Sequence, residues 1–318
     1  MTDKLTIALA QIAPVWLDRE KTAKKMVRYI KKAGKQGCDL VCFGEALLPG
    51  YPFWIDFTDG ARFNSEVQKD LYAHYVQQAV DAANGDLDDL CAAAKKHKVA
   101  VVAGIIERAT DRGGHSVYCA LVYINAKGKI KNLHRKLMPT YEERLVWAQG
   151  DGHGLRTQKL GAFTVGALNC WENWMPLPRA ALYGLGEDLH IALWPGNKRN
   201  TEISTRFQAR EGRSYAVSVS GIFRRKDIPK NIPHYDLIRK NCPKMPADGG
   251  SCIARPDGSW LIAPVTGKEQ LLIAELSHRK VLRERHNFDP AGHYARPDVT
   301  RLVVDRKRRG TVEVKGNS

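Results

Sequence analysis

The spacing of apolar residues changes along the first 45 residues. Residues 5–10 (LTIALA) have the two-residue spacing of a strand, and the apolar residues between Ala23 and Ala33 recur at helical spacing. Asp18 is expected to cap this helix, and Gly37 is expected to end it. The apolar run at 40–43 (LVCF) predicts a second, buried strand. The chain therefore opens with a strand–helix–strand unit, which favours parallel pairing of the two strands.

The alternation of strands and helices continues downstream. It predicts strands at 99–106, 116–125, 129–136, 163–169, 190–194 and 215–221, and helices at 86–97, 176–186 and 201–213. From residue 251 the pattern changes to short strands about the turn Asp257-Gly258. The Pro-rich segment 228–246 is expected to be a long surface loop. Together these elements predict an α/β fold with a two-layered, strand-rich core and helices outside.

No Gly/Ser/Pro linker, break in composition or fixed-period repeat divides the chain. We therefore expect one domain over residues 1–305, although a chain of 318 residues is long enough for two. The dense basic block Arg306-Lys-Arg-Arg309 opens a C-terminal tail, 306–318, which is expected at a subunit interface or in disorder.

Composition places the chain among globular proteins, with 43% apolar and 26% charged residues. No apolar run approaches the roughly 20 residues that a membrane span needs. The N-terminus does not resemble a cleaved signal, because its short apolar stretch is interrupted by Gln11. Seven cysteines, widely spread and without a CxxC pair, indicate neither a disulfide framework nor a zinc site, so we expect a reducing cytoplasm.

The net charge of +16 raises the possibility of a polyanionic partner. The lysines are dispersed over the predicted helices, and no nucleic-acid-binding signature accompanies them. We expect these charges to lie on solvated surfaces, which makes nucleic acid an improbable partner. A polyanion-binding protein is kept as the alternative from a different functional class.

Three ionisable residues directly or nearly follow predicted strands. They are Glu45 in FGEALLPGYP, Lys136 in HRKLMPTYEER and Cys170 in LNCWENWMPLPR. The carboxyl ends of strands in open α/β sheets are where ligands bind, so these side chains are placed to converge. Each also has an ordinary interpretation: Glu45 as a cap or ion-pair partner, Lys136 in an exposed basic turn, and Cys170 as a packing residue.

Together the three residues favour nucleophilic catalysis. A buried Glu45 would have a raised pKa and exchange protons near neutrality. Lys136, held by Glu142 or Glu143, would stabilise developing negative charge. Cys170 is expected at a helix N-terminus beside a lysine, which would lower its pKa.

The three blocks, in this order and at these separations, resemble the catalytic blocks of the nitrilase branch of the carbon–nitrogen hydrolase superfamily. The resemblance covers the chain to about Asp305. It implies Glu45 as general base and acid, Lys136 as electrostatic stabiliser, Cys170 as nucleophile, and Glu143 as the additional carboxylate. It also implies a four-layer αββα sandwich, and homodimers that pack helix face on helix face and often grow into larger spirals.

The Cys-Trp-Glu triplet at 170–172 resembles nitrile-cleaving members, so the resemblance implies hydrolysis of a nitrile to an acid and ammonia. A cyanide-degrading or nitrile-hydrating enzyme, or an amidase, remains the nearest alternative. No cofactor or metal is expected, since no metal-ligand spacing is present and His153 is interpreted as a loop residue.

The substrate pocket is expected to have aromatic walls, because nitriles are mostly apolar. Tyr51 and Trp171 abut the catalytic blocks, and Trp54 and Trp194 are further candidates. Two departures from the family pattern stand out. Gly44 occupies the position where proline usually precedes the glutamate, and ALWPGN at 192–197 replaces a run of small polar residues.

Overall fold

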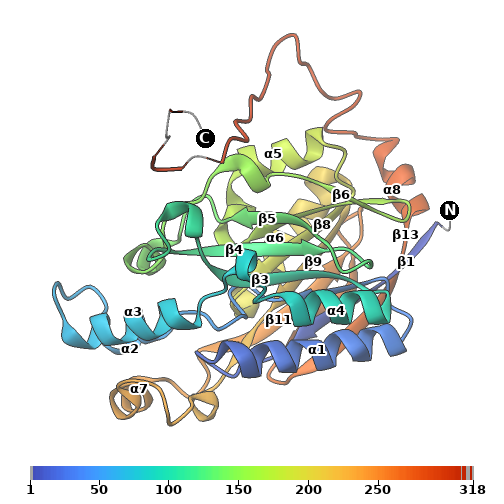
Figure 1. Cartoon of the computed structure of the whole chain (residues 1–318). Coiled ribbons are helices and arrows are strands. Elements are labelled where there is room, and N and C mark those ends of the chain that lie inside the picture. The colour runs from blue at the N-terminus through green and yellow to red at the C-terminus, as the bar shows by residue number, and fades with distance from the viewer. Residues whose placement is uncertain (1–2, 309, 313–315, 317–318) are drawn as a thin grey trace.

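The computed structural model describes residues 3–308, 310–312 and 316. Two mixed β-sheets pack face to face at its centre, and helices cover both outer faces (Figure 1). The first sheet has the strand order β13-β1-β2-β3-β4-β5 and the second β10-β11-β9-β8-β7-β6, with β12 paired to β11. This is the four-layer αββα sandwich implied by the family resemblance.

The strands of the first sheet are β1 (Lys4–Gln11), β2 (Leu40–Phe43), β3 (Ala100–Arg108), β4 (Val117–Ile124), β5 (Ile130–Arg135) and β13 (Gln270–Ser277). Those of the second sheet are β6 (Gln158–Leu160), β7 (Phe163–Asn169), β8 (Leu189–Trp194), β9 (Tyr215–Ser220), β10 (Ile222–Phe223), β11 (Ala247–Ala254) and β12 (Trp260–Thr266). The pairs β1–β2, β2–β3, β7–β8 and β8–β9 are parallel, which confirms the pairing predicted for the first two strands.

Alternate residues of β1 serve two different hydrophobic layers. Ile7 and Leu9 pack between the two sheets, whereas Ala8 and Ala10 pack beneath the outer helices. This follows from the two-residue period of a strand, which sends successive side chains to opposite faces. Both faces of the central strands are therefore buried, as expected for parallel strands covered by helices.

Helices α1 (Arg19–Lys35) and α4 (Asp88–His97) lie side by side on the first sheet (Figure 1). Asp18 caps α1 by accepting a hydrogen bond from the backbone N–H of Lys21. Helices α5 (Pro176–Gly184) and α6 (Lys198–Gly212) lie on the second sheet's side, where α6 packs on β8, β9, β11 and β12.

The segment 228–246 is more than the surface loop that its prolines predict. It contains helix α7 (Tyr235–Asn241), and Ile232, Ile238 and Cys242 are buried against the region around helix α2 (Trp54–Phe57). The prediction was wrong because the prolines, at 229, 233, 243 and 246, all lie outside the helix. The seven residues between them are therefore free to form helical hydrogen bonds. The apolar pattern also did not predict α2, α3 (Glu66–Gln78), α8 (His278–Arg285), β6 or β13.

After α8 the chain crosses the molecule as a long irregular segment and returns to the strand ends (Figure 1). Val304 packs against a small cluster that includes Leu155 and Leu168. The guanidinium of Arg308 donates to the Asp151 carboxylate, at 3.2 Å, and to the backbone oxygen of Leu133. The start of the basic tail is thus anchored on its own chain, while residues 309, 313–315 and 317–318 lie outside the described residues. Within the described part of the chain, each helix is too short or too polar to cross a membrane.

Candidate active site

Three strands end at the same place in the sandwich, and each is followed by one of the predicted catalytic residues. Glu45 comes two residues after β2, Lys136 directly after β5 and Cys170 directly after β7. Ligand atoms of Glu45, Glu143 and Cys170 all lie within 4.8 Å of one another. The structure therefore brings together four residues from three segments that are far apart in the sequence.

Lys136 connects the two carboxylates of this group. Its Nζ donates to Oε1 of Glu45 at 2.8 Å and to Oε2 of Glu143 at 2.6 Å, and its side chain is 1% exposed. The ammonium also lies 5.4 Å from the ring centroid of Trp147, on whose face a cation is attracted. The carboxylates raise the pKa of Lys136 well above its usual value although burial acts to lower it, so the ammonium stays charged. An ammonium has three donors, and the two carboxylates use two of them.

Glu143 is held by its own turn and by an aromatic hydroxyl. It lies in the short 3-10 helix η3 (Tyr141–Leu145), where its Oε2 accepts the backbone N–H of Thr140 at 2.6 Å. Its Oε1 accepts from the hydroxyl of Tyr51 at 2.9 Å. The sequence left either neighbouring glutamate as a partner of Lys136. In the structure Glu143 makes that contact, whereas Glu142 accepts from Tyr51 and lines the cavity described below.

Glu45 is buried, and its protonation is balanced near neutrality. Burial raises the pKa of the Glu45 carboxyl to about 7, against the opposing effect of the positive charge on Lys136. Glu143 adds to the rise through its negative charge. A carboxyl with this pKa exists in both protonation states at neutral pH, as a group that takes and returns protons must.

Cys170 occupies a strained position at the first residue of the 3-10 helix η5 (Cys170–Trp174). Its φ of 45° lies in the left-handed region, which costs a residue with a Cβ on the order of 1–3 kcal/mol. Nδ2 of Asn173 donates to the backbone oxygens of Cys170, at 2.8 Å, and Leu168, at 3.2 Å. These bonds hold the turn in the conformation that places the thiol at the strand end.

The expectation of a lowered thiol pKa was wrong. Burial, and next the negative charge of Glu45, raise the pKa of Cys170 well above its usual value, and Lys136 and the Trp171 N–H only partly oppose them. The full helix α5 begins only at Pro176, so Cys170 is not at its N-terminus. The resting thiol is thus protonated and requires a base, a role for which Glu45 is close enough.

Cys119, on β4, is a site residue that the sequence did not indicate. Its Sγ donates to Oε1 of Glu45 at 3.5 Å, and its backbone oxygen accepts the N–H of Lys136 at 2.8 Å. In the sequence it looks like one more apolar position of a buried strand. Only its register opposite the end of β5 could have indicated this role.

Two glycines let the Glu45 segment enter the site. A Cβ on Gly104 would lie 2.3 Å from the Gly44 oxygen, and a Cβ on Gly44 would lie 2.8 Å from the Trp194 oxygen. Gly44 is buried and closely packed, so the glycine that replaces the family's proline meets a steric requirement of this backbone. The backbone oxygen of Trp194 also accepts the N–H groups of Glu45 and Gly221, both at 3.1 Å.

A cavity of about 290 Å³ opens onto Cys170 and Glu143. Tyr51 and Trp171, two of the predicted pocket residues, line it together with Phe53. Trp54 and Trp194 are not among its lining residues. Trp54 packs in the core against Tyr75, and Trp194 is fully buried beside Cys170 with its indole N–H donated to Ser218.

The charged residues that line this cavity are all acidic: Asp56, Glu142 and Glu143. Its lining includes no lysine, arginine or histidine. Burial, and next the charge of Glu142, raise the pKa of Asp56, as expected for neighbouring acids at the cavity mouth. The local charge is therefore opposite in sign to the net charge of +16.

Among the described residues, one group has side-chain oxygen and sulfur atoms close enough together to coordinate a metal ion. It consists of Glu45, Glu143 and Cys170. Lys136 already binds both of these carboxylates. The positive charge that a metal would bring is thus supplied by a side chain.

The fold is an α/β sandwich, and its site holds a buried cysteine beside two carboxylates and a lysine. The profile of the carbon-nitrogen hydrolase family matches residues 6–283. The chain belongs to the carbon-nitrogen hydrolase family.

Curated relatives are similar over almost their whole length. A protein named nitrilase 2, from an unknown prokaryotic organism, is 36% identical over 97% of this chain and 95% of its own. An aliphatic nitrilase from Sinorhizobium fredii is 34% identical over 97% and 98% of the two chains, respectively. A bifunctional nitrilase/nitrile hydratase from Nicotiana tabacum is 32% identical over 95% of this chain and 86% of its own.

Solved structures support the fold at lower identity. A carbon-nitrogen hydrolase from Helicobacter pylori has a TM-score of 0.70 at 19% identity, over 93% of this chain and 96% of its own. A mutant amidase from Nesterenkonia, with acrylamide added at its active site cysteine, has a TM-score of 0.64 at 16% identity, over 89% and 97% of the two chains.

Proposed function

We propose that the protein is a nitrilase, which hydrolyses an organic nitrile to the carboxylic acid and ammonia. The observation that carries this proposal is the buried group of Cys170, Glu45, Lys136 and Glu143, of which Cys170 and Glu143 line a cavity. The named nitrilases among the relatives support it.

In the first half of the proposed mechanism, Cys170 sulfur attacks the nitrile carbon. Glu45 takes the thiol proton and returns it to the nitrile nitrogen, which gives a thioimidate. The Lys136 ammonium and the backbone N–H of Trp171 stabilise the negative charge that develops on nitrogen. Removing one such donor costs roughly 3–4 kcal/mol in comparable sites.

In the second half, Glu45 activates a water molecule that adds to the thioimidate carbon. The carbon–nitrogen bond of the tetrahedral intermediate breaks, ammonia leaves with a proton from Glu45, and a thioester remains. A second water hydrolyses the thioester, which releases the acid and restores the thiol. Glu143 keeps Lys136 and the substrate in place throughout.

The cavity wall suggests which nitriles are bound. Tyr51, Phe53 and Trp171 provide aromatic surface, which suits aryl or arylaliphatic nitriles. Asp56 and Glu142 favour neutral or cationic substrates over those with an additional carboxylate, and they repel the acid product.

A nitrile-hydrating activity is the second candidate, since the Nicotiana tabacum relative is named as bifunctional. It differs at the tetrahedral intermediate, where loss of the Cys170 sulfur instead of ammonia releases an amide. The test is therefore a nitrile panel in which acid, ammonia and amide are all measured, with Cys170→Ala as the inactive control. Acid with ammonia supports a nitrilase, and amide alone supports a hydratase.

Amidase activity is tested by the same assay with the matching amides. Turnover of nitriles by the Cys170→Ala variant would contradict the proposed nucleophile. If no nitrile or amide is turned over and the protein retards nucleic acid at physiological salt, the polyanion-binding alternative gains support.

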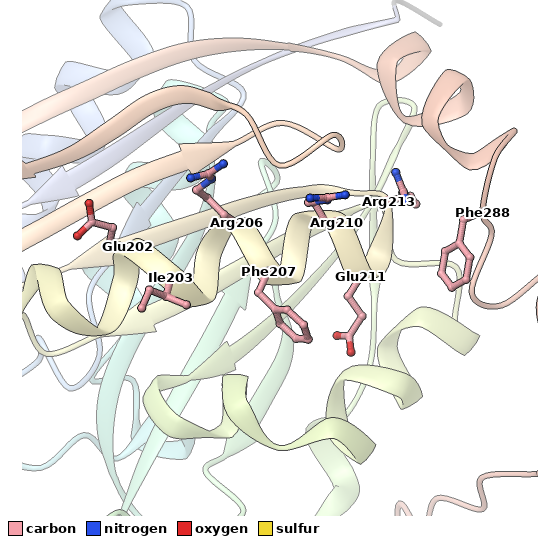
Figure 2. Close-up of a pocket in the computed structure, with 8 residues that line it drawn as sticks. All are labelled: Glu202, Ile203, Arg206, Phe207, Arg210, Glu211, Arg213 and Phe288. Carbon is pink, nitrogen blue, oxygen red and sulfur yellow. The ribbon is translucent and has the colours of Figure 1, made fainter.

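We propose a homodimer that can extend into a larger spiral and that forms through the outer face of α6. Ile203, Phe207 and Glu211 project from one side of this helix, and Arg206, Arg210 and Arg213 from the other (Figure 2). Ile203 is 78% and Phe207 is 55% exposed. A two-fold interface would cover these two apolar side chains.

We also propose that residues 1–305 act as one domain and that the basic tail 306–318 contributes to contacts between subunits. A reducing cytoplasm is the proposed location, since all seven cysteines are free.

A further inference from the structure

Glu172 lies two residues after Cys170 and does not line the cavity, yet its carboxylate connects two parts of the site. Its Oε1 accepts the backbone N–H of Leu137 at 2.7 Å and Nε2 of His134 at 3.0 Å. Its Oε2 accepts the backbone N–H of Asn169 at 2.9 Å. The Glu172 side chain is fully buried.

These contacts hold the main chain on both sides of the reacting groups. Leu137 directly follows Lys136, and His134 precedes Lys136 by two residues on β5. Asn169 directly precedes Cys170 at the end of β7. One carboxylate thus ties the segment that carries the ammonium to the turn that carries the thiol, across 35 residues of sequence.

The surroundings favour an ionised carboxylate. Burial acts to raise the pKa of Glu172, but its contact with His134 and the hydrogen bonds from the Leu137 and Asn169 N–H groups outweigh burial and leave the pKa below its usual value. An ionised carboxylate only accepts, so it pairs with the two backbone N–H groups and with the tautomer of His134 that carries a proton on Nε2. Gly154 packs closely on His134, since a Cβ on Gly154 would lie 2.2 Å from the His134 Cα and 2.9 Å from its Cγ.

We propose that Glu172 is a positioning residue that sets the separation between the Lys136 ammonium and the Cys170 thiol. The role of this separation rests on the proposed function. A displacement of about 1 Å between reacting groups can cost on the order of 100-fold in rate. The strained turn at Cys170 makes such a displacement possible, because the left-handed backbone relaxes when its restraints are removed.

The test is the variant Glu172→Gln, which keeps the volume of the side chain. Its amide NH₂ has to face an N–H donor, because the carboxylate accepts donors at both oxygens. We expect kcat for a neutral nitrile to fall about 100-fold with KM changed less than threefold. The rate of Cys170 alkylation by iodoacetamide, followed by peptide mass spectrometry across pH, is expected to change as well.

Glu107→Gln is the matched control. Glu107 is another buried carboxylate beside this segment, and it binds Arg135, but among the described residues it makes no hydrogen bond to the Cys170 turn. Its loss should lower the melting temperature and leave kcat per titrated active site within about twofold. The proposal is overturned if Glu172→Gln also retains native kcat and native alkylation while losing only thermal stability.

A second variant covers a failure of Glu172→Gln to fold. His134→Gln removes the ring but leaves the two backbone donors of Glu172, and an intermediate loss of kcat is expected. If neither variant yields folded protein, Glu172 has a role in folding instead, which also overturns the proposal. Absence of nitrile turnover in the native protein would refute the proposed function alone, since alkylation of Cys170 reports on the thiol without a nitrile.

Discussion

The Sγ of Cys119 and the Nζ of Lys136 both donate to Oε1 of Glu45, at 3.5 and 2.8 Å, respectively. Oε2 of Glu45 is buried and has no hydrogen-bond partner among the described residues. One oxygen therefore holds the carboxylate in place, and the other is the one that would exchange protons with thiol and substrate in the proposed mechanism.

Cys119→Ala should raise the pKa of Glu45, because a thiol donor that stabilises the charged carboxylate is lost. The bond is weak, so we expect kcat/KM at pH 6 to fall by only about two- to fivefold. Cys119→Ser, which restores a donor, should return the pH profile toward the native one. Identical profiles for the alanine and native proteins would show that the contact does not tune Glu45.

The pH dependence of kcat/KM should follow Glu45, whose pKa burial raises to about 7. In the proposed mechanism the ionised carboxylate is the base that takes the thiol proton, so activity is expected to rise with pH through about 7 and then level off. Glu45→Gln should lower kcat/KM by roughly 10²- to 10⁴-fold and abolish this limb. A native limb centred near pH 4.5, the ordinary value for glutamate, would contradict the assignment.

Gly104→Ala should displace the Glu45 segment, since the new Cβ would meet the Gly44 oxygen and the Glu45 Cα at 2.3 and 2.6 Å. Overpacking of this kind should lower the free energy of unfolding, measured with denaturant, by about 1–3 kcal/mol. Because the Glu45 segment moves, kcat should fall as well. Gly184→Ala is the control, because nothing lies within 4 Å of its added Cβ. Equal behaviour of the two variants would mean that the close approach has no consequence.

The acidic cavity mouth should discriminate among nitriles of equal size. We expect kcat/KM to be lowest for 4-cyanobenzoate and higher for p-tolunitrile and 4-(aminomethyl)benzonitrile. The double variant Asp56→Asn, Glu142→Gln removes both negative charges. Each screened charge contact is worth roughly 1 kcal/mol, so the ratio of kcat/KM between the uncharged and the anionic nitrile should fall about fivefold for each charge removed. Asp59→Asn, outside the cavity lining, should leave it unchanged. Discrimination that persists in the double variant would point to shape and not to charge.

The α6 face should govern assembly. Phe207→Asp places a charge where the proposed interface buries a ring, so the dimer measured by analytical ultracentrifugation should dissociate while the fold is retained. Val299→Asp alters an equally exposed apolar residue away from α6 and should not change the mass. An unaltered dimer in both variants would place the interface elsewhere.

Sequence patterns predicted those parts of the fold where hydrophobic period and caps agree. Strands β2 and β7 begin and end as predicted, and α1 is capped by Asp18 as expected. Helix α7 was missed because surrounding prolines outweighed a short apolar pattern. The short helix α2 and the edge strand β13 were missed because their residues become ordered through contacts distant in sequence.

The convergence of Glu45 and Lys136 could be inferred from strand ends, because β2 and β5 run the same way in one sheet and direct their carboxyl ends to one edge. Cys170 follows a strand of the second sheet, so its place beside them depends on how the two sheets pack. The thiol pKa could not, since it depends on how fully Cys170 is buried and on the nearby charge of Glu45. The role of Cys119 depends on strand register, and that of Glu172 on a turn whose conformation no spacing rule predicts.

The backbone oxygen of Trp194, which accepts the N–H groups of Glu45 and Gly221, joins the two sheets, because Glu45 follows β2 of the first and Trp194 ends β8 of the second. The segment that carries Glu45 therefore cannot separate from the sheet that carries Cys170 without breaking this junction. Loss of the site and loss of the fold are thus coupled into one cooperative event, so the Glu45 amide would exchange its hydrogen with solvent only through openings that cost nearly the full free energy of unfolding.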